Sequence, residues 1–452
     1  STDRTAGDIP VSGSVSFYLR LFNAQHSKTV PEDYKLVVAA VSKTWEEGVG
    51  LDLETYKDDT KGKSGSNWIT ASAGVAWTSP GGDYLNSADY VYTQDFSDGL
   101  EDIEVNITPL VERWIAGDQT NYGVGIRLSA SYEAYATAAD TSADSSVVTN
   151  TAGATTSYYT KRFFARGSQY FFKRPVIEAR WNSATHDDRG NFFYSSSLAP
   201  ELDNLNTIYF YNYVRGRLQN IPAIGTGEIF VDLYSGSADD SEPSGGILLQ
   251  SFDGAANPIR TPATGGYVST GIYSCSVCIT AATTPTPIET LYDVWRGPDA
   301  TPTQYFTGTI SPIVHYAVQT VRKPVFYANI TNNRGKYRND ENARFNVFIR
   351  EKFWNPTVYT VANSTVEATT IESASYRVYR TIDGFEAIPH GTGSDLHTLL
   401  SYDVSGNYFD FDMSLLQPGY EYAFKFAFYE SAVNSWSEQP ETFTFRVEDY
   451  EY

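Results

Sequence analysis

Aromatic side chains are the residues in this sequence best suited to hold a ligand by stacking. The chain has 34 Tyr and 8 Trp among its 452 residues. Surface rings could stack on sugar rings, because an aromatic face offers a large apolar contact area. Tyrosines half-buried in sheets are the commoner arrangement, since aromatic residues favour strands, and the sequence leaves both interpretations open. The candidates for a stacking platform are Tyr84, Tyr90, Tyr92, Tyr132 and Tyr135.

Catalytic groups do not form a pattern that indicates a reaction. The five histidines are scattered, with no pair at metal-ligand spacing, and no Gly-x-Ser-x-Gly motif occurs. The 54 acidic residues make carboxylate pairs so frequent that a glycosidase pair cannot be selected without geometry. Gly62-Lys63-Ser64 ends like a phosphate-binding loop, but Lys57 stands where such a loop needs its first glycine. We therefore expect no catalytic residues, no cofactor and no enzymatic activity.

Three aspartates near a glycine are the best candidates for a cation-binding loop. Asp95, Asp98 and Asp102 surround Gly99, and oxygen-rich loops can hold calcium. They lack the Asp-x-Asp-x-Asp-Gly spacing of a calcium loop, whereas solvated turns of this composition are common. We interpret the segment as a turn and predict no metal site.

The two cysteines do not indicate a disulfide or a zinc site. Cys275 and Cys278 are three residues apart, a spacing that places their side chains on opposite faces of a strand and hinders a local bridge. A zinc site would need two further ligands, and no second Cys-x-x-Cys or matching histidine pair exists. We expect both to be small buried strand residues.

The elements that position these residues begin with an apolar run followed by tryptophan and glycine. Residues 36–41 read Leu-Val-Val-Ala-Ala-Val, a run short enough for a buried strand. Glycines soon after it allow backbone angles that other residues resist. An indole buries much apolar area and usually needs a partner for its N–H, so clustered tryptophans are more often core than ligand platform. We therefore predict structural roles for Trp45, Gly48, Gly50, Trp68, Trp77 and Trp114.

Alternation and one helix signal define other elements of this region. Residues 15–21 alternate apolar and polar side chains, which predicts a half-buried strand. A second strand is expected at 103–107. Thr108 is then expected as the N-cap of a short helix with Pro109 at its first position, and Gly117 as its end.

Four ordered blocks in the first 180 or so residues resemble the DNRLRE family. Members of that family are jelly-roll β-sandwich modules related to carbohydrate-binding modules, and they occur in bacterial surface proteins and phage virions. Family members carry additional N-terminal strands, whereas only about 35 residues precede the apolar run here. The resemblance therefore implies either that the missing strands belong to a longer precursor or that another chain completes the sheet. The blocks are Trp45-x-Glu47-Gly48-x-Gly50, Gly65-Ser66-Asn67-Trp68, residues 77–83, and residues 103–114 with Asn121-x-Gly123.

Short strands separated by Gly, Pro and Ser continue to the end of the chain, which is typical of all-β sandwiches. Leu416-x-Pro418-Gly419-x-x-Tyr422 resembles the tyrosine corner of fibronectin type III and immunoglobulin-like domains, so Pro418 and Tyr422 receive structural roles. We predict an all-β protein. Its parts would be a jelly-roll-type sandwich with one short helix at 1–185, a linker at 186–203, an immunoglobulin-like sandwich at 204–322, and an immunoglobulin/fibronectin type III-like sandwich at 323–452.

The charge of the chain narrows its partners. With 33 basic and 54 acidic residues the net charge is −21, so phosphate backbones and anionic membrane surfaces would be repelled. No run of 18 apolar residues occurs. Ser1-Thr2-Asp3-Arg4 lacks the pattern of a signal peptide, which favours a cytoplasmic origin or a start within a longer precursor.

The chain as a whole resembles virion structural proteins from tailed phages of marine bacteria, cyanophages especially. Such proteins join a DNRLRE-like module to immunoglobulin-like ones. The resemblance implies a non-enzymatic decoration, appendage or fibre component, assembled in the host cytoplasm, with other virion proteins or copies of itself as partners and a host-surface glycan as a further candidate. The alternative is an extracellular carbohydrate-binding protein of a bacterium. The residues that carry the resemblance are 16–24, 45–50 and 399–408.

Overall fold

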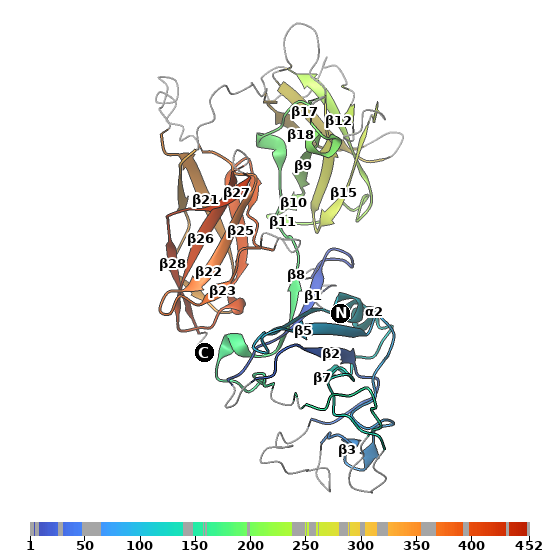
Figure 1. Cartoon of the computed structure of the whole chain (residues 1–452). Coiled ribbons are helices and arrows are strands. Elements are labelled where there is room, and N and C mark those ends of the chain that lie inside the picture. The colour runs from blue at the N-terminus through green and yellow to red at the C-terminus, as the bar shows by residue number, and fades with distance from the viewer. Residues whose placement is uncertain are drawn as a thin grey trace. The chain divides into compact units, whose positions relative to one another are not determined.

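The structure is a computed structural model in which the chain forms two compact units, Ser1–Asn182 and Ser183–Tyr452. Figure 1 shows the elements of each unit. The residues that the structure describes are 4, 9–25, 30–47, 65–138, 148–156, 158, 161–196, 199–236, 249, 251–252, 259–260, 262–279, 288, 290–298, 303–313, 324–353, 368–391, 397–430 and 434–449.

Strands dominate both units. The described residues contain strands β1 to β28 and a single α-helix, α2 (Thr108–Ala116). The prediction of an all-β, sandwich-type protein is confirmed. Within the described part of the chain, no helix has the length and apolar character needed to cross a membrane.

The first unit contains two three-stranded antiparallel sheets that pack face to face. Buried apolar residues of both sheets form one cluster, which includes Phe17, Tyr34 and Phe96. The alternation predicted around residue 17 is confirmed, because Phe17 and Leu19 are buried and their neighbours are not. The sheets are β6 (Ile103–Asn106), β1 (Ser16–Leu21) and β8 (Val176–Arg180), and β5 (Val91–Phe96), β2 (Tyr34–Ala40) and β7 (Val124–Leu128). A separate hairpin joins β3 (Thr70–Ser72) to β4 (Val75–Ala76).

Helix α2 lies against the first sheet and begins differently from the prediction. The N-cap residue is Ile107, and no side chain caps the helix. Thr108 is already helical, and its hydroxyl accepts a hydrogen bond from the backbone N–H of Phe17 at 2.8 Å. A tertiary partner on β1 thus replaces the local cap. The C-terminal prediction is confirmed, since Gly117 ends the helix with a left-handed φ of 84°.

The first sandwich of the second unit is one six-stranded sheet folded over itself. Its two halves share one buried cluster that includes Phe210, Tyr273 and Trp295, so they face each other. Strand β15 belongs to both halves. A Cβ on Gly265 of this strand would lie 2.5 Å from the backbone oxygen of Ser274, so the close approach requires glycine. The strand order is β18 (Gln304–Ile310), β17 (Thr290–Arg296), β12 (Ile229–Gly236), β15 (Ala263–Ser269), β16 (Ile272–Val277) and β9 (Asn206–Tyr211).

The structure also contains short two-stranded sheets and 3-10 turns. The pairs are β10 (Tyr213–Val214) with β11 (Arg217–Leu218), and β13 (Ser251–Phe252) with β14 (Ile259–Arg260). The 3-10 turns among the described residues are η2 (Phe171–Lys173), η3 (Asp188–Gly190), η4 (Glu201–Asn204) and η5 (Met413–Leu415). Cys275 and Cys278 are buried, as predicted.

The second sandwich of this unit packs two sheets around an aromatic core. Phe424 lies within 4.9 Å of Phe345, 5.1 Å of Phe409 and 4.5 Å of Phe445, measured between ring centroids. One sheet is β19 (Phe326–Ile330), β21 (Asn342–Glu351), β25 (Gly406–Asp412) and β24 (Ser401–Asp403). The other is β20 (Lys336–Arg338), β28 (Phe443–Glu448), β26 (Glu421–Glu430), β22 (Ala374–Arg380) and β23 (Glu386–Ile388), with β27 (Ser435–Glu438) paired to β26.

The predicted tyrosine corner has its hydrogen bond. Tyr422 is fully buried, and its hydroxyl donates to the backbone oxygen of Gln417 at 2.9 Å. Gly419, next to Pro418, has a φ of 89°, which is a conformation that glycine tolerates best. This turn therefore fixes the entry of the chain into β26.

The segment predicted as a linker is built into the second unit. Phe192 is fully buried in the core of the folded sheet, and Asn206 binds both the N–H and the carbonyl of Phe193. Residues 185–187 pair with Ser401 and Tyr402 of the neighbouring sandwich. The side chains of this segment thus find buried partners that are distant in sequence.

Candidate functional site

The tyrosines predicted as a stacking platform are mostly occupied by contacts within the first unit. The ring of Tyr84 is packed so closely against Gly82 and Gly125 that a Cβ at either glycine would come within 2.7 Å of it. Its hydroxyl donates to the backbone oxygen of Gly81 at 3.0 Å, and the guanidinium of Arg127 lies 5.5 Å from the ring centroid. Tyr84 therefore supports the loop instead of offering a free face.

Three further candidates also have structural partners. Tyr92 packs against the core, and its hydroxyl donates to the backbone oxygen of Asp89 at 2.6 Å. Tyr132 packs edge-on against Tyr158 at 5.2 Å. Tyr90 is half-buried beneath the guanidinium of Arg113, which lies 5.4 Å away.

Tyr135 differs from these four because it is 50% exposed. The set as a whole does not form one surface platform, because four of its five members serve the packing of the unit.

Two tryptophans that were predicted to be core residues are exposed. Trp45 is 41% exposed and Trp68 is 46% exposed, so the prediction of a buried tryptophan cluster is wrong for both. Trp45 still has a partner for its N–H, which donates to the backbone oxygen of Tyr122 at 2.6 Å. The side chain of Trp68 covers Gly81, where a Cβ would lie 2.7 Å from the ring. Both loop tryptophans thus have contacts within the unit and are still more than 40% exposed.

The other two tryptophans are partly buried. Trp114 on α2 packs against the core of the first unit. Trp77 donates its N–H to the backbone oxygen of Asn67 at 2.8 Å, which closes the β3–β4 hairpin. Gly48 and Gly50 lie outside the described residues. The structural role predicted for Trp77 and Trp114 agrees with these contacts.

A lysine occupies the loop that sequence reasoning considered for calcium. The ammonium group of Lys161 donates to the backbone oxygens of Gly99 and Glu101 at 3.0 and 2.7 Å, and to Oδ1 of Asn23 at 2.9 Å. The carboxylate of Asp102 accepts the N–H of Asn23 at 2.6 Å. Oxygens that could ligate a cation are therefore used by a side-chain cation of the same unit. Among the described residues, no three His, Cys, Asp or Glu side chains gather into a metal-binding group.

Three residues of the second sandwich resemble a hydrolase triad in type and order: Ser375 on β22, His390 just after β23, and Glu438 on β27. Ser375 Oγ is 2.9 Å from Nδ1 of His390, and Nε2 of His390 is 3.9 Å from Glu438. These residue types form hydrolase triads when the serine is accessible. Here Ser375 is fully buried and also contacts Thr398 Oγ1 at 3.1 Å, and 3.9 Å is too long for a hydrogen bond. We interpret the three as a structural contact.

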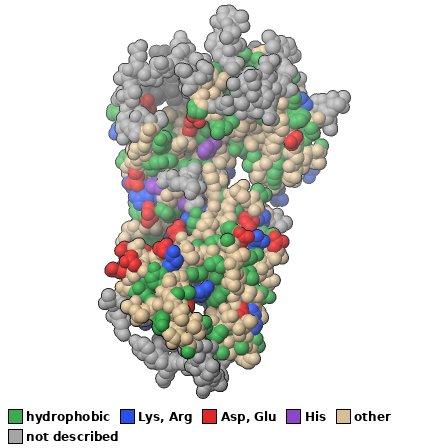
Figure 2. Space-filling view, turned by 45° about the vertical axis from the view of Figure 1, so that its right-hand side comes forward, with side chains coloured by type: hydrophobic (Ala, Val, Ile, Leu, Met, Phe, Trp, Pro, Cys, Tyr) green, Lys and Arg blue, Asp and Glu red, His purple; other side chains and the backbone are tan. Residues whose placement is uncertain are grey.

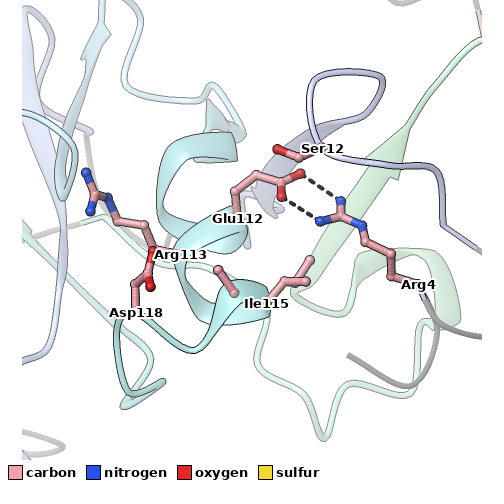
Figure 3. Close-up of a pocket in the computed structure, with 7 residues that line it drawn as sticks. Arg4, Ser12, Glu112, Arg113, Ile115 and Asp118 are labelled. Atoms are coloured by element: carbon pink, nitrogen blue, oxygen red, sulfur yellow. Dashed lines mark hydrogen bonds and ion pairs between the residues drawn. The ribbon is translucent and has the colours of Figure 1, made fainter.

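A surface pocket of about 490 Å³ lies beside helix α2. Figure 3 shows the guanidinium of Arg4 facing the carboxylate of Glu112, with Ser12 beside them. The two groups form a bidentate pair at 2.6 and 2.8 Å, and the hydrogen bond from Arg4 holds the pKa of Glu112 below its ordinary value. The central charges of this pocket thus neutralise each other.

Opposite charges are also paired on the outer face of the sheet β6–β1–β8. Arg180 forms ion pairs with Glu104 at 2.7 Å and with Glu178 at 3.0 Å, and its guanidinium lies 4.2 Å from the ring centroid of Tyr18. Figure 2 shows basic and acidic side chains interspersed over the face that it presents. This arrangement cross-links strands and does not create a patch of one sign.

The most elaborate polar cluster lies between the two sandwiches of the second unit. Residues 185–190 run between them and contact both. Tyr402 accepts and donates main-chain hydrogen bonds there: its N–H donates to Thr185 at 2.9 Å, and its carbonyl accepts from Asp187 at 3.0 Å. The ring of Tyr402 stacks on His186 at 4.8 Å. We call residues 185–190 and these partners the joint.

An ion pair anchors the joint to the folded sheet. Arg189 binds Asp293 of β17 through two hydrogen bonds of 2.6 Å each. Asp293 is fully buried and also accepts the N–H of Trp295 at 2.7 Å. A Cβ at Gly308 would lie 2.4 Å from the guanidinium of Arg189, so glycine at this position of β18 leaves room for the arginine.

Asp188 connects the same segment to both sandwiches. Its carboxylate accepts the hydroxyl of Tyr402 at 2.6 Å and the backbone N–H of Thr207 at 2.6 Å. Burial raises the pKa of Asp188, although both hydrogen bonds act against the rise. A single carboxylate therefore ties β24 of one sandwich to β9 of the other.

Sequence reasoning missed the joint. The sequence feature that marks the joint is a run of four ionisable residues, His186-Asp187-Asp188-Arg189, followed by the aromatic pair Phe192–Phe193. Charged residues next to large apolar ones are poorly explained by a solvated spacer. That contrast could have indicated a buried segment, but not its partners more than 100 and 200 residues away.

No protein-family model matches this chain, and a search of curated proteins found no significant match.

Proposed function

We propose that this chain is a non-enzymatic structural protein of a tailed-phage particle, serving as a decoration, appendage or fibre component. It would be assembled in the host cytoplasm and contact other virion proteins or copies of itself. The proposal rests on the sequence resemblance described above and on one structural observation, the polar joint between two tandem sandwiches. Tandem sandwiches joined through buried contacts keep their ends at a fixed separation, which suits a spacer or appendage.

An open sheet edge supports assembly with other chains. Strand β8 pairs with β1 on one side, and no described strand pairs with its other side. Val176 and Ile177 of β8 are 44% and 48% exposed. An unprotected edge with apolar side chains favours strand addition by another chain.

Electron microscopy tests the location. Particles purified from a lysate of the host that expresses this chain would be labelled with an antibody to the chain, with pre-immune serum as control. Labelling at a fixed position on the particle would support the proposal. Its failure would be shown by purified particles in which mass spectrometry detects every major structural protein but not this chain.

Sedimentation velocity tests assembly through β8. We expect the purified chain to self-associate or to be unstable alone, and Ile177→Lys to reduce association, because a charge at an edge opposes strand pairing. Leu202→Lys is the matched control, since Leu202 is 78% exposed outside any strand. A monomeric wild-type chain that releases reducing sugar from cell-envelope glycans would replace this proposal with an enzyme.

A second candidate function is glycan binding by an extracellular protein, which the exposure of Trp45 (41%) and Trp68 (46%) favours. Indole rings at a protein surface can stack on sugar rings. The test is binding of the chain to host-envelope glycans, compared with Trp45→Ala and Trp68→Ala. Tyr170→Ala serves as control, because Tyr170 is 54% exposed and aromatic. Binding that is lost only in the tryptophan variants would support this candidate.

A further inference from the structure

The joint holds more carboxylates than cations. Asp187, Asp188 and Asp293 lie in it, and the guanidinium of Arg189 donates two hydrogen bonds to Asp293 and a longer one to the backbone oxygen of Tyr209. Asp187 is 5% exposed. Its carboxylate accepts backbone hydrogen bonds from Arg189, at 3.2 Å, and from Tyr209. A buried carboxylate with so few donors is poorly compensated when ionised.

Like charge also faces Asp187 from the neighbouring sandwich. The carboxylate of Asp403, the last residue of β24, interacts repulsively with Asp187 across the joint. Asp403 is held in place because Ser405 donates both its N–H and its hydroxyl to it, at 2.7 and 2.5 Å. The two sandwiches therefore meet with two carboxylates on opposite sides.

We propose that the joint is proton-sensitive: Asp187 takes up a proton in mildly acidic solution, and the two sandwiches are then held together more tightly than at neutral pH. The proposal concerns the protein's own conformation and does not depend on its location in a particle.

The other titratable groups around Asp187 do not supply a positive charge that would compensate its ionised carboxylate. On the segment itself, Asp188 is a second carboxylate and His186 is a neutral imidazole with a buried Nε2 that has no hydrogen-bond partner. Burial lowers the pKa of His186, so the imidazole resists becoming the missing cation. From β9 the neighbouring titratable groups are Tyr209 and Tyr211, whose pKa values burial raises.

The remaining titratable neighbours are also tyrosines. Burial raises the pKa of Tyr402 on β24 and of Tyr408 on β25. Phenols with raised pKa values stay neutral in the acidic and neutral range. Among the described residues, Arg189 is thus the cation that faces Asp187, and it is shared with Asp293.

The sign of the effect follows from the proton affinity of Asp187. Burial raises the pKa of Asp187 to about 6, from an ordinary value of 3.8. A group whose pKa is raised in the closed state binds protons more tightly there than in the open state. The resulting stabilisation is fully present below the ordinary value and is lost as the pH rises through about 6. Asp188 acts in the same direction, whereas protonation of His186 at lower pH acts against it.

Amide hydrogen exchange of the full chain can measure this. The N–H groups of Asp187 and Tyr402 form the two main-chain hydrogen bonds of the joint, so their protection reports local opening. After correction for intrinsic exchange rates, Asp187 alone should raise protection by about tenfold between pH 7.5 and pH 5. Amides of β26 in the adjacent core provide the reference for global stability.

Variants separate Asp187 from its surroundings. Asp187→Asn should remove the tenfold gain and leave only the pH dependence that comes from Asp188 and His186. Asp403→Asn should move the gain in protection to lower pH, because it removes the facing charge. His186→Gln should extend the gain to lower pH. Asp203→Asn is the matched control, since Asp203 is exposed in η4, and it should behave like wild type.

Protection that is unchanged or falls between pH 7.5 and pH 5 in the wild-type chain would overturn the proposal. So would a tenfold gain that persists in Asp187→Asn. If that variant does not fold, Asp403→Asn still decides, because an unshifted transition would show that Asp187 is not the group that titrates.

Discussion

The core of the last sandwich and the loop region of the first unit use aromatic residues in opposite ways. Phe424 is fully buried and contacts Phe345 of the facing sheet and Phe445 of its own sheet. Trp45 and Trp68 are larger, yet they are more than 40% exposed. Phe424 occupies a central strand covered by a second sheet, whereas the two tryptophans lie outside strands. Hydrophobic character alone therefore does not place a ring in the core; an extended strand facing another sheet does.

Charged residues show the same contrast. The pair Arg189–Asp293 is buried and fixed by two short hydrogen bonds, whereas Arg344–Asp410 has the same bidentate geometry with both side chains more than half exposed. Ion pairs in water contribute little to stability, but breaking a buried one leaves a charge without compensation. Substitutions of buried residues, compared with substitutions of exposed residues of the same kind, test this contrast directly.

The largest effect is expected in the aromatic core. Phe424→Ala should lower the free energy of unfolding by about 3–5 kcal/mol, because it removes a buried ring and leaves a cavity. Chemical denaturation of the full chain, followed by the fluorescence of Trp436 and its neighbours, measures the loss. Phe424→Leu is the control and should cost less. If the alanine variant is as stable as wild type, the ring is not part of a packed core.

The next largest effect is expected at the joint. Arg189→Met should lower the free energy of unfolding by about 3 kcal/mol at neutral pH, since Asp293 stays buried without its counter-charge. Arg344→Met, at the exposed pair, should cost less than about 1 kcal/mol. Thermal unfolding of both variants side by side makes the comparison. Equal losses would contradict the view that burial distinguishes the two pairs.

A smaller effect is expected at the tyrosine corner. Tyr422→Phe should cost about 1–3 kcal/mol, because it removes the buried hydroxyl that satisfies the carbonyl of Gln417. Tyr429→Phe provides a control on the same strand, since Tyr429 is 39% exposed. An unchanged melting temperature in Tyr422→Phe would mean that the hydrogen bond does not contribute.

The smallest effect is expected in the first unit. Trp45→Phe should change the free energy of unfolding by about 1 kcal/mol or less, since it loses one hydrogen bond to Tyr122 but little buried area. Differential scanning calorimetry measures the transition of the full chain. A loss as large as that of Phe424→Ala would show that the indole is a core residue after all, as the sequence had suggested.

Local patterns were sufficient to predict much of the fold. Alternation predicted β1, the run at 36–41 predicted β2, and the glycine after the helix predicted where α2 ends. The spacing of Tyr422 from upstream residues predicted the corner. These features depend on residues within a few positions of one another, so the sequence contains all of the relevant geometry.

Contacts between distant residues were decided only by the tertiary structure. Thr108 binds Phe17 instead of capping its own helix, Lys161 fills an oxygen-lined loop 60 residues away, and Asp188 reaches Tyr402. In each case a polar group found a partner that no local pattern specifies. Burial in the tertiary structure also changes proton affinities, because it raises the pKa of Asp187. The sequence by itself determined which strands form, whereas the pairing of polar groups depended on which strands came together, because desolvation makes those partners necessary.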